Sequence, residues 1–196
     1  ARLLNSHKAL FQQHNKSPTA FVKNKEWKIG DLLIQMDLAK TLKRIQANGE
    51  KEFYEGETAK LIVEEMKKGN GIITLNDLKN YKTKTRKPLV FQFKGHEIVS
   101  MPLPSSGGIL LAQMLKMYSH NTINNPQINT YETVQPMIEA ERRAYADRAE
   151  YMGDPDFIKD ETAKLISDDY LKKRWSSYNN NEATPSKDVG KIVTVT

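Results

Sequence analysis

A turn built from two prolines and two glycines, Met101-Pro-Leu-Pro-Ser-Ser-Gly-Gly108, limits how this chain can fold more than any other stretch. Proline fixes φ and glycine admits conformations that other residues avoid, so the chain is first stiff and then permissive. Before the turn, apolar side chains alternate along 89–93, and Lys94-Gly95 can turn the chain into 96–100, as in a β-hairpin. After the turn, 109–118 has the apolar content of a buried helix. The sequence therefore predicts an α+β fold in which a hairpin leads directly into a helix.

Helical periodicity dominates the rest of the chain. Apolar residues recur at helical spacing in 38–45 and in 59–66, and glycines follow both stretches. Asp37 is available as the N-cap of the first helix. Thr74-Leu-Asn-Asp77 has the spacing of a capping box, which predicts a short helix after it, and Ser167 can cap a last helix. The chain is predicted to be largely helical around one hairpin.

The longest predicted helix begins at a cap formed by Thr130 or Thr133 and reaches about Met152. Pro136 is predicted to lie in its first turn, where backbone N–H groups have no partner within the helix. The apolar stripe of this helix is predicted to be Val134, Met137, Ile138, Ala144, Tyr145 and Met152. The polar face, predicted to be a salt-bridged surface or a subunit contact, carries Glu139, Glu141, Arg142, Arg143, Asp147 and Arg148.

Composition excludes several classes of protein. The 196 residues are 38% hydrophobic and 28% charged, which is lean for a soluble domain, and no apolar run approaches the roughly 18 residues of a membrane span. The absence of cysteine excludes a disulfide framework, a thiolate zinc site and a cysteine nucleophile. The chain starts at Ala1 without a methionine or a signal peptide, so we interpret its start as a cut or an expression boundary.

The net charge of +6 and the pI near 9.3 invite a nucleic-acid interpretation. Most basic residues, however, alternate with acids, and the denser patches at 82–87 and 172–174 lack the aromatic residues of a stacking platform. Solvated helix and loop faces are the better interpretation, and no nucleic-acid partner is predicted.

The proline-glycine turn is also the first candidate functional motif, comprising Pro104, Ser105, Ser106, Gly107 and Gly108. A helix N-terminus can hold an anion, because its free N–H groups and its dipole point outward. A serine there could also be a nucleophile, but no Gly-x-Ser-x-Gly elbow is present. A structural turn is favoured, a ligand-positioning loop comes second, and a nucleophile comes last.

A second candidate motif consists of Asp154, Pro155 and Asp156, which could bind a cation, act as an acid and base pair, or simply form a turn. The turn is favoured. The four histidines are far apart and none has the i, i+4 partner of a helical metal site, so no metal is predicted. From the residues alone, the chain has no complete catalytic constellation.

Four blocks of sequence, 71–81, 86–88, 95–108 and 140–157, closely resemble the gamma-glutamyltranspeptidase family in order and in spacing. The resemblance implies an N-terminal-nucleophile hydrolase, a four-layer αββα sandwich shared by two subunits. In that family one precursor cuts itself, and the new N-terminal threonine of the small subunit takes the gamma-glutamyl group from glutathione or a related amide. The group then passes to water or to an amino acid, and no cofactor is expected.

The resemblance implies that 1–178 is the C-terminal part of the large subunit and that 179–196 is a flexible tail leading to the autocleavage junction. The partners would be the small subunit of the same precursor and a gamma-glutamyl substrate. Thr194 and Thr196 lie near that junction, but neither is N-terminal, so no catalytic or substrate-binding residue is predicted in this chain. The two candidate motifs would then scaffold the site of an otherwise inactive fragment.

Alternatives stay open. The chain could be a stand-alone basic module that binds an anion, or a family member that acts on poly-gamma-glutamate or acylated amides. The resemblance also implies a periplasmic or secreted protein. A fragment without its partner is further expected to expose Leu110, Leu111 and Met114 or the strand residues Leu89, Phe91 and Phe93.

Overall fold

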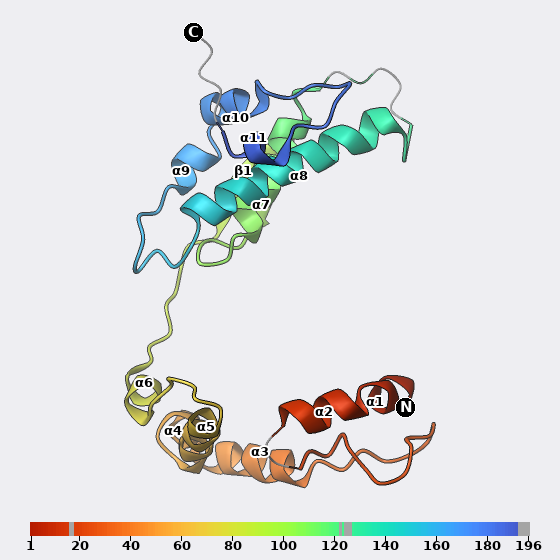
Figure 1. The fold of residues 1–196 in the computed structure, drawn as a ribbon. Helices are drawn as coiled ribbons and strands as arrows, with labels where there is room; N and C mark the ends of the chain where they lie inside the picture. Colours follow the sequence, from red (N-terminus) through yellow and green to blue (C-terminus); the bar gives the residue numbers. More distant parts are fainter. Residues whose placement is uncertain (16–17, 122, 124–126, 192–196) are drawn as a thin grey trace. The chain divides into compact units, whose positions relative to one another are not determined.

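The computed structural model describes residues 1–15, 18–121, 123 and 127–191, which form two compact units divided between Lys84 and Thr85 (Figure 1). Unit 1 contains the helices α1 (Arg2–Ser6), α2 (Lys8–His14), α3 (Met36–Asn48), α4 (Glu50–Tyr54), α5 (Glu57–Lys68) and α6 (Leu75–Asn80). Unit 2 contains the strands β1 (Leu89–Phe93) and β2 (His96–Ser100) and the helices α7 (Gly107–Tyr118), α8 (Tyr131–Tyr151), α9 (Thr162–Leu165), α10 (Asp168–Trp175) and α11 (Ser186–Val189). Within the described residues, no helix is long and apolar enough to cross a membrane.

Local capping chemistry sets the helix boundaries of unit 1. The predicted capping box of α6 is confirmed, because the Thr74 N–H donates to Asp77 Oδ2 (2.8 Å) and the Asp77 N–H donates to Thr74 Oγ1 (3.2 Å). The predicted N-cap of α3 is wrong by two residues: Gln35 is the N-cap, and Asp37 lies in the first turn, where its negative charge interacts favourably with the helix dipole. Gly49 ends α3 with a positive φ of 63°, and α4 follows at once without having been predicted.

Unit 1 buries little apolar surface. Among its described residues, the buried hydrophobic ones are Ala59 and Val63 of α5. The large apolar residues that stay exposed before and along α3 are Ile29, Leu32, Leu33, Ile34, Met36, Leu38 and Leu42. Of the predicted apolar stripe of α3, Leu38 and Leu42 are therefore exposed, and Ile45 is half-buried.

The predicted hairpin of unit 2 is confirmed, with β1 and β2 antiparallel and Phe91 opposite Ile98. Lys94 and Gly95 turn the chain with φ values of 46° and 79°, as the primed hairpin turns require. α7 packs against the hairpin and against α8, and the core of unit 2 lies between α7, α8 and α10. The fully buried apolar side chains there include Ile109, Met117 and Leu171.

The six residues expected to be exposed in a partnerless fragment are not exposed, so that expectation is wrong. Leu110 and Phe91 are buried, and Leu89, Phe93, Leu111 and Met114 are half-buried. The hairpin and α7 cover one another, and exposed apolar residues lie instead on other faces of unit 2, such as Val99 and Met101.

The face of helix α8 that is buried differs from the predicted one. Its buried residues are Thr133, Pro136, Glu139, Ala140, Arg143, Ala144 and Asp147. Of the predicted apolar stripe, Ala144 is buried and Met152 is half-buried, whereas Val134, Met137, Ile138 and Tyr145 are exposed. The prediction failed because α8 buries small residues against α7, together with charged residues whose partners come from distant segments.

The start of α8 is set by its threonines. Thr130 is the N-cap, and the Thr133 hydroxyl accepts from its N–H (3.2 Å). The helix therefore begins early enough to place Pro136 beyond the first turn, contrary to prediction. Proline has no backbone N–H, so position 136 cannot donate a hydrogen bond to the carbonyl of Glu132. Helix interiors rarely tolerate this loss. The ring of Pro136 is almost fully buried on the inward face.

Candidate functional site

The proline-glycine turn holds the N-terminus of α7 against the end of the hairpin. Leu103 is 2% exposed and anchors the turn in the core of unit 2, and the Leu103–Pro104 peptide is cis. Glycine is needed at position 108, since a Cβ there would lie 2.3 Å from the carbonyl oxygen of Met101. At Gly107 the nearest atom would be 3.7 Å away. The two glycines therefore have different roles, and only the second permits close packing.

The serines of the turn have structural partners. The Nε of Arg148, from α8, donates to the hydroxyl of Ser106 (3.1 Å), and the Ser106 carbonyl accepts from the N–H of Leu110 in the first turn of α7. The N–H of Ser105 donates to the carbonyl of Pro102 (3.1 Å). Within the part of the chain that the structure describes, no carboxylate or imidazole hydrogen-bonds to either hydroxyl. Neither serine has the base that an alkoxide nucleophile needs.

The second candidate motif forms a turn tied to the residues before β1. The N–H of Asp156 donates to Asp154 Oδ1 (3.0 Å), and Nη2 of Arg86 lies 3.4 Å from Asp154 Oδ1 and 3.1 Å from Asp156 Oδ1. Pro155 lies between the two acids. Both acids thus pair with an arginine, and the described residues contain no cluster of three or more side chains suited to a metal ion. Arg148 contacts the first motif, and Arg86 contacts the second.

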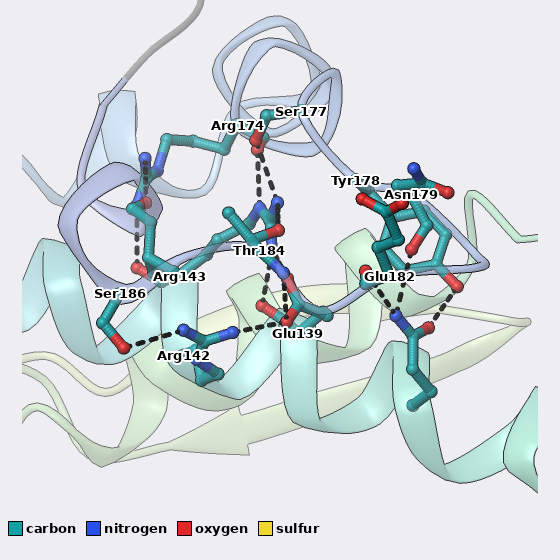
Figure 2. Close-up of polar contacts among 12 residues, drawn as sticks. Glu139, Arg142, Arg143, Arg174, Ser177, Tyr178, Asn179, Glu182, Thr184 and Ser186 are labelled. Atoms are coloured by element: carbon teal, nitrogen blue, oxygen red, sulfur yellow. Dashed lines mark hydrogen bonds and ion pairs between the residues drawn. The ribbon is translucent and has the colours of Figure 1, made fainter.

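A third constellation, absent from the predictions, consists of charged residues buried between α8 and α10. Glu139, Arg143, Asp147 and Arg174 are each at most 3% exposed. All five N–H donors of the Arg143 guanidinium find acceptors (Figure 2). These acceptors are the carbonyl of Arg174, the carbonyl and carboxylate of Glu139, and the hydroxyls of Ser177 and Thr184. Arg143 is therefore a fully satisfied interior cation.

Arg174 of α10 and Arg143 of α8 form reciprocal hydrogen bonds across the interface of the two helices. Nη2 of Arg174 donates to the carbonyl of Arg143 (3.0 Å) while Nε of Arg143 donates to the carbonyl of Arg174 (3.0 Å). Nε of Arg174 forms an ion pair with Asp147 Oδ1 at 3.0 Å, and Gln113 of α7 donates to Asp147 Oδ2 (2.8 Å). The network thus joins α7, α8 and α10.

Burial acts differently on the two acids of this network. Burial raises the pKa of Glu139, but hydrogen bonds from Thr184, Arg143 and Arg142 outweigh that effect and hold the pKa below its ordinary value of 4.5. Burial raises the pKa of Asp147 above its ordinary value, in spite of the nearby charge of Arg174. Burial, together with the charge of Asp147, also raises the pKa of Tyr170. The environment therefore favours an ionised Glu139 and penalises an ionised Asp147.

The sequence carried a weak signal for this network. Pro136, Ala140 and Ala144 recur at helical spacing, and small residues on one face of a helix allow close approach to another helix. Glu139 and Arg143 share that face. Arg174 offered no such signal, because it ends a run of three basic residues that resembled a solvated patch.

The sequence and the fold of this chain are similar to those of known proteins. The family model for gamma-glutamyltranspeptidase matches residues 1–194. The glutathione hydrolase proenzyme of Escherichia coli strain K12 is 41% identical over 177 residues, which cover 90% of this chain and 30% of that protein. The capsule biosynthesis protein CapD proenzyme of Bacillus anthracis is 39% identical over 142 residues, covering 72% of this chain and 26% of that protein.

Among solved structures, the gamma-glutamyltranspeptidase of Helicobacter pylori matches 98% of this chain and 57% of its own, with a TM-score of 0.85 and 38% identity. The chain thus spans about 30% of the length of the curated relatives it matches. These likenesses confirm the resemblance inferred from the four sequence blocks and the α+β class with its hairpin. The chain belongs to the gamma-glutamyltranspeptidase family.

Proposed function

We propose that this chain is the C-terminal part of the large subunit of an enzyme that transfers or hydrolyses the gamma-glutamyl group of glutathione and related amides. The observation that carries the proposal is 41% identity to a glutathione hydrolase proenzyme over 90% of the chain. The word proenzyme in that name fits a precursor that cuts itself into two subunits. The small subunit is then the partner of this chain, and its N-terminal threonine is the nucleophile.

The geometry supports a scaffold role for the chain itself. The polar groups of both candidate motifs contact arginines of unit 2, and among the described residues no carboxylate or imidazole hydrogen-bonds to either serine hydroxyl. A hydroxyl without a base is a poor nucleophile at neutral pH. In this proposal, residues 104–108 fix α7 against the hairpin and residues 154–156 fix the end of α8, so that both helices support the site that the small subunit completes.

Relatives in the family have different names, and the names suggest which substrates to compare. CapD is named for capsule biosynthesis, and two further relatives are named acylases. We place this protein with the glutathione hydrolases. Two of them are 41% identical over 90% and 83% of the chain, whereas CapD is 39% identical over 72%. We further place the enzyme in the periplasm or outside the cell, following the family resemblance.

Expression of the complete gene tests this function. The precursor should yield two fragments on a denaturing gel, and the product should release the chromophore from a gamma-glutamyl anilide. Replacement of the threonine at the new N-terminus by alanine should abolish both events. Ser105→Ala and Ser106→Ala should leave turnover within a small factor of the wild type.

Two results would contradict the proposal. One is clear turnover by the 196 residues alone that Ser105→Ala abolishes, and the other is salt-sensitive anion binding by an uncleaved protein without transferase or hydrolase activity. A panel of glutathione, poly-gamma-glutamate and acylated amides then ranks the substrates by kcat/KM, and glutathione should rank first.

A further inference from the structure

The buried arginines of unit 2 bind the segment that follows α10, and they bind it at several points. Nη2 of Arg143 donates to the hydroxyls of Ser177 and Thr184, both at 2.9 Å. Nη1 of Arg174 donates to the carbonyls of Val189 (3.1 Å) and Lys191 (3.3 Å). The segment 177–191, which is Asn-rich and polar, is thus held on α8 and α10 by guanidinium groups that are themselves inaccessible to water (Figure 2).

Weaker contacts along the same segment support this arrangement. The Gln135 side chain of α8 donates to the carbonyl of Asn179 (3.0 Å) and accepts from the hydroxyl of Tyr178 (2.6 Å). The N–H of Thr184 lies 3.3 Å from Glu139 Oε1, and Val189 is buried. Each contact pairs a particular residue of the segment with a particular residue of the helices.

The buried contacts fix the register of the segment. Arg143 uses all five of its donors and has no access to water, so any sliding of the segment by one residue removes the Thr184 hydroxyl and leaves a buried, charged N–H without an acceptor. Unpaired buried donors are costly, and charged ones more so. Arg142 makes a further contact with the Ser186 hydroxyl (3.2 Å), but that contact is exposed to water and can be replaced by it.

We propose that Arg143 and Arg174 are positioning residues for maturation: they hold the chain as far as Lys191, so that the peptide bond to be cut is presented from a fixed point. This inference rests on the proposed function. Cleavage itself consumes one water: the C–N bond breaks, the carbonyl carbon gains the hydroxyl and the nitrogen gains the proton.

A matched pair of variants at one position tests the proposal in the full precursor. Thr184→Val keeps the shape of the side chain and removes the acceptor, whereas Thr184→Ser keeps the hydroxyl. Conversion of purified precursor to subunits, followed over time on denaturing gels, should be about tenfold slower for Thr184→Val, which corresponds to about 1.4 kcal/mol in barrier height. Thr184→Ser should mature at close to the wild-type rate.

Two further variants separate positioning from folding. Ser177→Ala removes the other acceptor of the same guanidinium nitrogen and should also slow conversion, and it replaces Thr184→Val if that variant fails to fold. Ser186→Ala removes the exposed contact with Arg142 and should mature normally. Once cleaved, every variant should show the wild-type kcat and KM, since the acceptor acts on the cut and not on the mature site.

The outcomes distinguish the two hypotheses. Wild-type maturation rates for both Thr184→Val and Ser177→Ala would overturn the positioning role and leave the proposed function intact. Slow maturation together with an equal loss of kcat in the mature enzyme would overturn it too, because that pattern marks a general structural defect. A wild-type precursor that never cleaves would overturn the proposed function, and the inference with it.

Discussion

The two units of the chain differ in what they bury. Unit 2 buries aliphatic and aromatic side chains of α7, α8 and α10, and it buries a set of paired charges as well. Unit 1 buries Ala59 and Val63 among its described apolar residues, and it leaves Ile29 fully exposed and Leu32 83% exposed. An exposed row of this kind is unusual in a free-standing protein and is typical of a covered surface. Of the two units, one thus has an apolar core and the other leaves a row of large apolar residues exposed.

Two tryptophans make the comparison measurable. Trp27 lies in unit 1, where its ring N–H donates to the carbonyl of Phe21 (2.8 Å). Trp175 lies in unit 2 and stacks on Tyr178. Single-tryptophan versions of the chain, Trp175→Phe and Trp27→Phe, therefore report separately on unit 1 and unit 2 during urea unfolding.

The largest difference in unfolding free energy is expected from removing one ion-paired arginine in each unit. Arg174→Met leaves the buried carboxylate of Asp147 without its cation and should lower the free energy of unfolding of unit 2 by about 3–5 kcal/mol. The counterpart Arg44→Met removes a pair in which the arginine is 29% exposed and the buried Glu52 carboxylate keeps the N–H and hydroxyl of Thr58 as donors, so it should cost unit 1 about 1 kcal/mol. Equal losses in the two units would contradict the contrast between a fully buried pair and one whose arginine is partly exposed.

Truncation of a leucine in each unit gives the next largest effect. Leu171→Ala creates a cavity at a fully buried position and should destabilise unit 2 by about 2–5 kcal/mol. Leu42→Ala removes a side chain that is 57% exposed and should change the stability of unit 1 by less than about 0.5 kcal/mol. A large loss from Leu42→Ala in the isolated chain would show that unit 1 has a core of its own.

The glycines of the turn test whether the hairpin belongs to the core of unit 2. Gly108→Ala forces a Cβ against the Met101 carbonyl and should cost about 1–3 kcal/mol by overpacking. Gly107→Ala meets no close atom and is the control, with an expected change of less than about 0.5 kcal/mol. The readout is the urea midpoint from Trp175. An unchanged midpoint for Gly108→Ala would mean that the hairpin moves away from α7 at no cost.

The smallest expected effect is the part of the pH dependence of unit 2 that comes from Glu139. The pKa of Glu139 is lowered in the folded state, so its contribution is complete above 4.5, its ordinary value, and is lost as the pH falls through the folded pKa. The pKa of Asp147 is raised, so the folded state binds the carboxyl proton of Asp147 more tightly than the unfolded state does. Acidification therefore favours the folded state at Asp147, in contrast to Glu139. Urea midpoints from pH 6 down to pH 3 should fall less steeply in Glu139→Gln than in the parent. A parallel fall in both would exclude this role of Glu139.

Features set by neighbouring residues could be predicted from the sequence. The capping box of α6, the hairpin and its turn, and the Ser167 cap of α10 all depend on residues within a few positions of one another. The same locality explains the two candidate motifs, whose compact turns were favoured from the start. That residues 104–108 and 154–156 support a catalytic site stays a prediction.

The inward face of α8 could not be predicted, because its partners are distant in sequence. Three acceptors of Arg143 lie 31 to 41 residues away, in α10 and in the segment after it, and the other two belong to Glu139, four residues away. Hydropathy counts that arginine as a surface residue, and only the fold supplies the carbonyls and hydroxyls that make its burial possible. The division at residue 178 likewise stays a prediction, although the structure places Thr184 and Val189 against the two arginines.

Heating gives the buried charges of unit 2 a further consequence. The hydration of ions becomes less favourable as the temperature rises, so the cost of removing Arg143, Arg174 and their acids from water declines on warming. Hydrophobic stabilisation has no comparable gain at high temperature. On a thermal ramp, the polar interior of unit 2 should therefore outlast a wholly aliphatic interior of the same volume.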